Sequence, residues 1–388
     1  MKKSKFNFLM GMVIFALSAC SQNNLDPMDE NGNIPTLPKE TATVYLQANA
    51  AAFKANSLSR TSQIYDDLNS LRILAFRQNG EKYLYIGDVD KTNITYDGTS
   101  FTGTAQLPVG TYKFIPTYGL PQIGDANLSL SNLDYTTPYS DNLMTSHLEN
   151  GVLPAIFLQE ENVTVKDYIL GVDSKETNSK ISLNLTRAIA RLDIQFVQGE
   201  KKDAESPYTE KAGVVFGANK NLANLTLSFE DLNPSVQLTN GKLVTENITP
   251  VNTVINVDLS KVRTDGIGEK TIYGQPKEDG TAYDYEAIAG QDFINGSTHI
   301  YGPFLFPFAD TATEGSNLTL TLTSTLDDIT HQVYTRTIHI DKVPLSRNKV
   351  TLIKIYSGGD DIFHTNTSFE ITINKAWESH QEISGSVE

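Results

Sequence analysis

Three groups of polar side chains in this sequence have the residue types that metal binding or acid–base catalysis requires. His331 and His339 lie eight residues apart, and a pair of imidazoles can bind a metal ion. Asp88, Asp90 and Asp97 suggest part of a calcium loop, but the turn glycine and the distal glutamate are not at the required positions. Paired carboxylates can hydrolyse glycosidic bonds, yet no spacing of the acidic residues indicates such a pair. We therefore expect solvent-facing histidines, turn carboxylates and no metal site.

Sequence motifs for nucleophilic or phosphate chemistry are absent from the chain. It contains no Gly-x-Ser-x-Gly, no Walker A motif and no His-Glu-x-x-His. The 31 Lys and Arg residues are outnumbered by 46 Asp and Glu, which gives a net charge of −15. A nucleic-acid binder normally carries a basic surface, so this balance argues against one. We expect neither an enzyme, nor a cofactor, nor a nucleic-acid partner.

The single cysteine gives a sharper chemical signal. Cys20 is the one cysteine in 388 residues, so no intramolecular disulfide can form. Residues 1–20 have a basic start, an apolar stretch from Phe8 to Leu17 and small residues before the cysteine. This resembles a bacterial lipobox, in which a peptidase cleaves before the cysteine and its sulfur carries lipid. We expect a lipoprotein signal peptide over 1–20 with lipid on Cys20; the alternatives are a signal peptide with a chance cysteine, or an uncleaved anchor.

Strands are the elements that the rest of the sequence predicts. Residues 21–40 are polar, with Pro, Asn and Gly, and predict a flexible tether. Alternating apolar and polar residues dominate after residue 41, as where Val44 and Leu46 share one face. Asn79-Gly80 and Asp97-Gly98 are strong hairpin signals between such segments. The 39% apolar content is enough for a real core, so we expect folded β-structure rather than global disorder.

The arrangement of these strands predicts an all-β chain of two tandem β-sandwich domains, transthyretin-like or Greek-key. A polar break places the domains at 41–177 and 178–388. Just after it, the apolar phase slips by one residue near Thr186-Arg187, which predicts a bulge or a bend between two strands. The stretches 200–222 and 264–292 are expected to be long loops.

Five pieces of sequence occur in a recognisable order. They are the lipobox, a first strand containing Ala42-Thr43-Val44, the central Leu-Thr-Arg-Ala-Ile-Ala-Arg-Leu-Asp-Ile at 185–194, the late Pro-Leu-Ser-Arg-Asn-Lys-Val-Thr-Leu at 344–352, and a final strand ending in Trp377. This order resembles that of the fimbrillins of Bacteroidales, the stalk proteins of type V pili. The resemblance covers most of the mature chain and is weak in the long loops. It implies two β-sandwich domains, export to the outer membrane as a lipoprotein carrying palmitate, and assembly with other fimbrial subunits at the cell surface.

The resemblance also implies proteolytic maturation. In fimbrillins a trypsin-like surface protease cuts after a basic residue beyond the first strand, and the matching position here is Arg60. The small and polar residues around it predict an accessible loop. Lys54 and Arg72 are competing sites, and Arg72 should be protected because it lies in a predicted strand. Cleavage after Arg60 would release the first strand, 43–53, together with the lipid.

A sandwich that loses a strand exposes an apolar groove and unpaired backbone groups, which another chain can fill. The donor that the resemblance implies is the segment 367–377, in which the apolar side chains alternate; these are Phe369, Ile371, Ile373 and, near its end, Trp377. Gly358, Gly359 and the polar run 360–367 are expected to be the hinge that frees this segment. The alternative is that 367–377 pairs within its own domain.

Four polar residues of the two longer motifs are expected to be structural. Arg187 and Arg191 should form ion pairs, and Arg347 and Asn348 should shape the turn into the strand 350–356. The function we expect is a fimbrial subunit polymerised by strand exchange; a tip or anchor subunit is the near alternative. A surface glycan-binding lipoprotein, with Tyr283 and Tyr285 as the aromatic candidates, represents a different class.

Overall fold

The computed structural model describes most of the chain. It describes residues 37–49, 68–120, 128–130, 133, 137–140, 144–147, 156–159, 165–171, 180–200, 203, 206, 209–232, 235–239, 250–259, 270–276, 283–288, 298–306, 315–375 and 379–386. These residues form strands almost throughout, which confirms the all-β prediction. Within these ranges the one helix is the three-residue 3₁₀ turn η2 (Leu68–Ser70), and no helix is long and apolar enough to cross a membrane.

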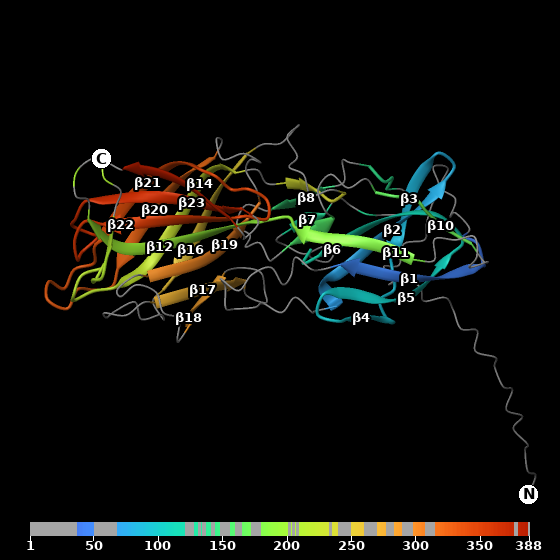
Figure 1. Cartoon of the computed structure of the whole chain (residues 1–388), viewed down its shortest axis with the longest axis horizontal. Coiled ribbons are helices and arrows are strands. Elements are labelled where there is room, and N and C mark those ends of the chain that lie inside the picture. Colours follow the sequence, from blue (N-terminus) through green and yellow to red (C-terminus); the bar gives the residue numbers. More distant parts are fainter. Residues whose placement is uncertain are drawn as a thin grey trace, which may run out of the picture.

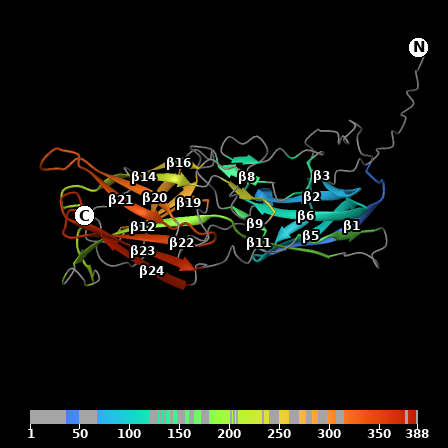
Figure 2. The same cartoon turned by 90° about the horizontal axis from the view of Figure 1, so that it is seen from above.

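The molecule is elongated, with two halves that follow one another along its long axis (Figures 1 and 2). The first half contains one nine-stranded sheet in the order β3-β2-β6-β9-β11-β1-β5-β4, with β10 paired to β6. Its strands are β1 (Thr41–Asn49), β2 (Leu71–Asn79), β3 (Lys82–Asp88), β4 (Ile94–Tyr96), β5 (Ser100–Pro108), β6 (Gly110–Tyr118), β9 (Phe157–Gln159), β10 (Tyr168–Leu170) and β11 (Lys180–Arg187).

This first sheet curls over so that its ends face each other. Phe101 of β5 stacks on Tyr118 of β6 with ring centroids 5.9 Å apart, although four hydrogen-bonded steps separate the two strands within the sheet. The alternating apolar residues of both ends meet in one core, and Phe76, Phe101, Phe114 and Phe157 are fully buried there. The two layers of the first half are thus parts of a single sheet.

The second half is built from two sheets. The larger is eight-stranded, in the order β18-β17-β19-β12-β22-β23-β24 with β13 paired to β12, and the smaller is β16-β14-β20-β21. The strands of the larger sheet are β12 (Ala190–Glu200), β13 (Thr209–Lys211), β17 (Lys270–Pro276), β18 (Tyr283–Ile288), β19 (Thr298–Leu305), β22 (Val350–Ser357), β23 (Thr367–Lys375) and β24 (Ser379–Ser386). The smaller sheet contains β14 (Leu222–Leu232), β16 (Val251–Asp258), β20 (Ser316–Ser324) and β21 (Thr335–Val343).

A third, three-stranded sheet is formed by segments from both sides of the central motif. It has the order β15-β8-β7, from β7 (Leu128–Leu130), β8 (Met144–His147) and β15 (Ser235–Gln237). Because β7 and β8 precede β11 while β15 follows β12, this small sheet links the first part of the chain to the second by backbone hydrogen bonds.

The predicted change of phase in the central motif is confirmed as the passage from one sheet to the next. β11 ends at Arg187 and β12 begins at Ala190, so only Ala188 and Ile189 separate them. The domain boundary expected between 177 and 178 lies outside the described residues, and the strand that follows it, β11, still pairs with β1 and β9 of the first sheet. As a division into domains, 41–177 and 178–388 therefore stays a prediction.

The prediction of a long loop over residues 264–292 is wrong. Within 264–292 the chain forms β17 and β18, which pair along six positions from Thr271–Ile288 to Pro276–Tyr283. The Gly and Asp residues of this stretch favour turns, so the short alternating segments between them are not predicted as strands. Pairing with neighbouring strands decides the conformation of these segments. β13 likewise lies in the predicted loop 200–222.

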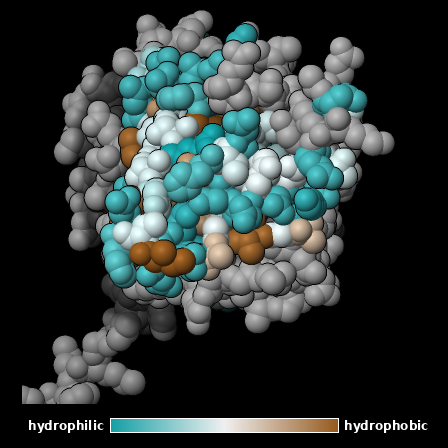
Figure 3. All heavy atoms as spheres, turned by 90° about the vertical axis from the view of Figure 1, so that its left-hand side faces the viewer, coloured by the Kyte–Doolittle hydropathy of each residue, from teal (hydrophilic) through white to brown (hydrophobic). Residues whose placement is uncertain are grey.

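Figure 3 looks onto the free end of the second half, where the surface is largely hydrophilic with hydrophobic atoms gathered along one side. The loop between β20 and β21 contributes three large apolar side chains that are exposed; these are Leu326, Ile329 and Val333. Asp327 holds this loop in shape, because its carboxylate accepts hydrogen bonds from the backbone N–H groups of Ile329 and Thr330.

Candidate functional site

The first strand, β1, lies in the interior of its sheet. It pairs with β5 along all nine residues, from Thr41–Pro108 to Asn49–Ser100, and with β11 in parallel from Tyr45–Lys180 to Asn49–Asn184. Its alternate residues point into the core and are almost fully buried; these are Ala42, Val44, Leu46 and Ala48. The sequence predicted this face correctly, and residues 50–53 of the expected strand lie outside the described part of the chain.

Polar side chains fasten the inner end of β1 to both neighbours. Asn49 donates from Nδ2 to Oδ1 of Asn184 on β11 at 2.8 Å, and its own Oδ1 accepts from Oγ of Ser100 on β5 at 3.2 Å. Gln47 donates to the same Asn49 oxygen at 2.9 Å. Asn49 therefore ties three strands together at the point where β1 leaves the sheet.

The protease sites predicted after β1 divide into those the structure describes and those it does not. Arg60 and Lys54 lie outside the described residues, as does Cys20. Arg72 lies in β2, as predicted, is buried, and pairs with Asp88 at 2.6 Å; its protection from the protease stays a prediction that this position favours. Just before it, Lys91 donates from Nζ to the carbonyl oxygens of Leu68 and Leu71 at 2.7 and 2.6 Å. The chain is thus firmly held from residue 68 onward.

The predicted donor segment lies inside the second half's larger sheet. β23 pairs with β22 from Thr367–Ser357 to Asn374–Val350, and with β24 along its other side. Ile371 and Ile373 are buried, and Phe369 packs partly buried against the core. Trp377 lies outside the described residues. In this structure the segment pairs within its own half, as the alternative stated, and releasing it would break backbone hydrogen bonds on both sides.

The segment expected to be a hinge, 358–367, is instead held by charged groups, which corrects that expectation. Lys220 is buried and donates to Oδ2 of Asp361 at 2.6 Å. Burial alone would raise the pKa of Asp361, but its hydrogen bonds with Lys220 and His364 hold that pKa below its ordinary value. Arg336 donates to the carbonyl oxygens of Ile362 and Thr365, and to Oγ1 of Thr367 at 3.0 Å. The buried Lys220 and the partly buried Arg336 therefore hold in place a segment that Gly358 and Gly359 had suggested to be flexible.

The other polar residues singled out from the sequence have structural roles. Oδ1 of Asp90 accepts from the N–H of Thr92, and Asp97 caps the turn before β5. Asp88 pairs with Arg72 rather than pointing to an ion site. His331 lies in the β20–β21 loop and His339 in β21, and no group of three or more metal-binding side chains occurs within the ranges described above. Tyr283 and Tyr285 lie in β18.

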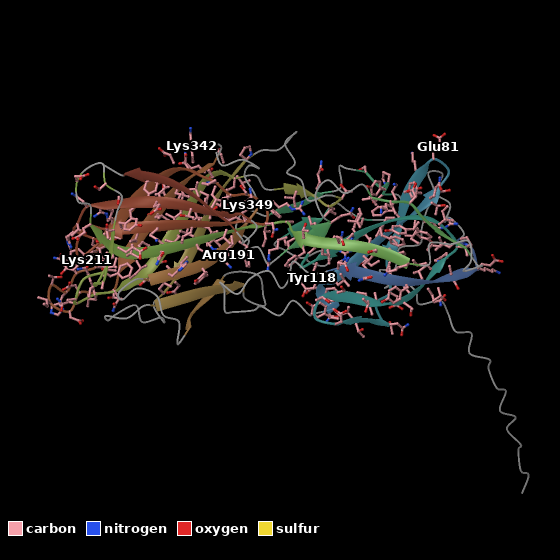
Figure 4. The ribbon with its side chains drawn as sticks, viewed as in Figure 1. Glu81, Tyr118, Arg191, Lys211, Lys342 and Lys349 are labelled. Atoms are coloured by element: carbon pink, nitrogen blue, oxygen red, sulfur yellow. The ribbon has the colours of Figure 1, made fainter. Side chains whose placement is uncertain are left out.

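The central and late motifs meet where the two halves join (Figure 4). Arg191 forms a two-pronged ion pair with Asp193, with both N–O distances at 2.8 Å, as expected. The guanidinium of Arg187 lies over the ring of Phe157, 5.1 Å from the centroid. The backbone N–H of Arg191 donates to the carbonyl oxygen of Lys349 at 3.1 Å. Two sequence motifs separated by more than 150 residues thus form one structural unit.

The sequence does not predict one contact of the late motif. Arg347 was expected to shape the entry into β22, but its side chain crosses to the first half, where it donates to the carbonyl oxygens of Gln159 and Arg187 at 2.9 and 3.0 Å. The phase slip at 186–187 was the available signal, since a chain that changes sheets leaves carbonyl groups that need donors.

Comparison with known proteins finds a family that matches about half of the chain. Residues 52–242 match the family model of the fimbrillin-A associated anchor proteins Mfa1 and Mfa2. This part of the chain is therefore similar to that fimbrial family. The match runs from the segment after β1 through the junction and into the second half, so it includes the central motif. No curated protein matches the chain significantly.

Comparison with solved structures gives matches of low sequence identity. The fimbrial anchor protein Mfa2 from Porphyromonas gingivalis is 9% identical, with 90% of this chain and 100% of that one covered, at a TM-score of 0.37. A candidate adhesin from Bacteroides ovatus is 12% identical over 95% and 99% of the two chains, with a TM-score of 0.41. A candidate polysaccharide-binding protein from Bacteroides thetaiotaomicron is 12% identical over 88% and 98%, with a TM-score of 0.42.

Proposed function

We propose that this chain is an anchor-type subunit of a cell-surface fimbrium. Lipid on Cys20 holds it in the outer membrane, residues 21–40 lead from the lipid to the fold, and β1 stays in its sheet. Other fimbrial subunits are its partners. The family match supports the fimbrial role, and the single structural observation that carries the anchor role is the interior position of β1.

The packing of β1 makes its loss costly. Removing the strand would expose the backbone edges of β5 and β11 and the core that four buried side chains now fill. Full burial of one Val or Leu side chain is worth roughly 1.5–3 kcal/mol, and open strand edges invite pairing with other chains. A subunit that keeps β1 avoids both costs and needs no replacement strand.

The direction of β1 also suits an anchor. Thr41 pairs with Pro108 beside the β5–β6 turn at the outer end, while Asn49 lies toward the junction. A pull on the tether therefore acts along the strand, so the hydrogen bonds to β5 and β11 share the load instead of breaking one after another. The strand that connects lipid to fold is held in the geometry that resists such a pull.

A shaft subunit is the second candidate, because β1 is also the strand whose removal would open an apolar groove between β5 and β11. In that case a trypsin-like protease cuts after Arg60, and a neighbour's segment replaces β1 by strand exchange. The described part of the donor, residues 367–375, has no free edge, since β23 is paired on both sides. We therefore place this function second.

Two substitutions in the producing cell distinguish the candidates. For an anchor, Cys20→Ala releases the protein from the outer membrane and the fimbriae detach, whereas Arg60→Ala changes neither its location nor fimbrial length. Lys54→Ala, in the same connection, is the matched control. Fractionation, immunoblotting and electron microscopy measure these outcomes. Loss of fimbriae and accumulation of a longer precursor in Arg60→Ala would show a shaft subunit, and normal membrane attachment of Cys20→Ala would contradict lipid anchoring.

A further inference from the structure

The two halves are joined without an exposed linker. Ala188 and Ile189, the residues between β11 and β12, are almost completely buried. The N–H of Ala188 donates to the carbonyl oxygen of Ile156 in the first half at 2.9 Å. The carbonyl oxygen of Ile189 accepts from the N–H of Asn348 in the second half, also at 2.9 Å. Each of the two connecting residues is thus bound to a different half.

Arg347 forms a second connection, independent of the covalent one. It lies in the segment between β21 and β22 of the second half, and its guanidinium reaches β9 and β11 of the first. It donates to the carbonyl oxygens of Gln159 and Arg187, and to Oγ1 of Thr186 at 2.8 Å. The planar guanidinium has several N–H groups that point in different directions, so it can donate to three acceptors at once. Hydrogen bonds from a charged donor are also stronger than those between neutral groups.

The backbone around Arg347 fixes the direction of this side chain. Asn348 has a φ of 53°, a left-handed conformation that is uncommon for residues other than glycine and that Asn tolerates better than most. The N–H of Lys349 donates to the carbonyl oxygen of Ser346 at 3.2 Å, closing a tight turn between two buried residues, Leu345 and Val350. The side chain of Arg347 therefore starts from a rigid turn. Little conformational entropy of the backbone is lost when its guanidinium binds the acceptors in the first half.

We propose that Arg347 couples the two halves mechanically, so that they rotate and unfold as one unit. Without it, the connections left between the halves are the peptide chain at 188–189 with its two backbone hydrogen bonds and the three paired positions of β8 and β15, and we expect these to act as a pivot. If the proposed anchor function holds, tension enters at β1, passes to β11 along their parallel pairing, and must cross this junction to reach the second half. Figure 1 shows β1 and β11 side by side in the first half, and β12 along the same long axis in the second. The coupling itself does not depend on the anchor function.

The matched control is another arginine with three similar hydrogen bonds. Arg336 donates to two carbonyl oxygens and one threonine hydroxyl, as Arg347 does, but all its acceptors, in residues 362–367, belong to the second half. Arg347→Met and Arg336→Met each keep an apolar stem and remove the donors. The two variants therefore lose comparable bonding at different places in the molecule.

Calorimetry and hydrogen exchange on the full chain test the coupling. We expect a single cooperative transition in the unsubstituted protein and in Arg336→Met, at a lower midpoint in the latter, and two transitions in Arg347→Met. The amide of Asn348 should exchange about tenfold faster in Arg347→Met and no more than about twofold faster in Arg336→Met.

Three results would overturn the coupling. They are two transitions in the unsubstituted protein, one transition in Arg347→Met, and equal splitting by both substitutions. If Arg347→Met does not fold, Arg347→Lys serves in its place, since lysine keeps the charge but cannot bind three acceptors with a planar fork. Unchanged exchange of the Asn348 amide in Arg347→Lys would then reject the proposal.

Discussion

At the residue scale, the polar groups of this protein hold strands together. Arg72, Asp88 and Tyr85 form one such group, in which the carboxylate of Asp88 accepts from Nε of Arg72 at 2.6 Å and from the Tyr85 hydroxyl at 2.7 Å. The group joins β2 to β3 directly after the predicted protease loop. We therefore expect Arg72, a basic residue close to that loop, to be a poor protease target.

Replacing Asp88 with Ala should destabilise the fold and expose Arg72. The substitution leaves a nearly buried guanidinium without its carboxylate, which typically costs about 3–5 kcal/mol. We expect a lower urea midpoint, and tryptic cleavage after Arg72 that the unsubstituted protein resists under the same conditions. Asp90→Ala, which removes an exposed turn carboxylate, is the control. Equal cleavage after Arg72 in all three proteins would mean that the pair does not protect this bond.

Another buried group makes the stability depend on pH. His299 of β19 stacks on Tyr301 with ring centroids 4.0 Å apart, and its Nε2 lies 4.0 Å from a carboxylate oxygen of Asp193. Burial lowers the pKa of His299 to about 4, with Asp193 opposing this shift and Arg191 and Lys354 adding to it. The native imidazole is therefore neutral at pH values where the unfolded chain already binds a proton.

Acidification from pH 6.5 to 4 should consequently weaken the fold through His299. In this window the unfolded state holds more protons, so the free energy of unfolding falls as the pH falls, by at most about 3 kcal/mol. In His299→Gln this part of the pH dependence should disappear. Urea titrations at several pH values measure it, and an equal slope in both proteins would show that His299 is not buried as a neutral group.

At the element scale, β1 decides whether the first sheet is complete. Leu46→Ala removes a buried side chain from the middle of this strand and should lower the free energy of unfolding by about 2–5 kcal/mol. Tyr45→Ala, at the neighbouring exposed position, should cost far less. Denaturant titration compares the two. Similar small losses in both variants would mean that β1 contributes little to the core.

The strands that the sequence predicts best are those with regular alternation. β1 and β20 show this pattern, because every second residue along each of them is buried and apolar or small. β17 and β18 do not, since their pairing partners rather than their own residues select the strand conformation. The rigid segment 358–367 also escapes prediction, because its stability depends on Lys220 and Arg336, which are distant in sequence.

Contacts between distant strands limit what could be predicted of the candidate site. The apolar face of β1 and the protection of Arg72 follow from local patterns. The reach of Arg347 does not, because its acceptors on β9 and β11 precede it by about 160 to 190 residues and become neighbours only through the fold. The lipid on Cys20, cleavage after Arg60 and the position of Trp377 stay predictions.

At the scale of the whole molecule, β1, the junction and the second half follow one another along the long axis (Figure 1). The central claim is that β1 remains in this line in the mature protein. The most direct test is mass spectrometry of the N-terminal peptide of the protein recovered from the cell surface. We predict a lipid-modified Cys20 as the first residue, in a chain that still contains β1. A first residue of Thr61, with no lipid and no β1, would contradict the account.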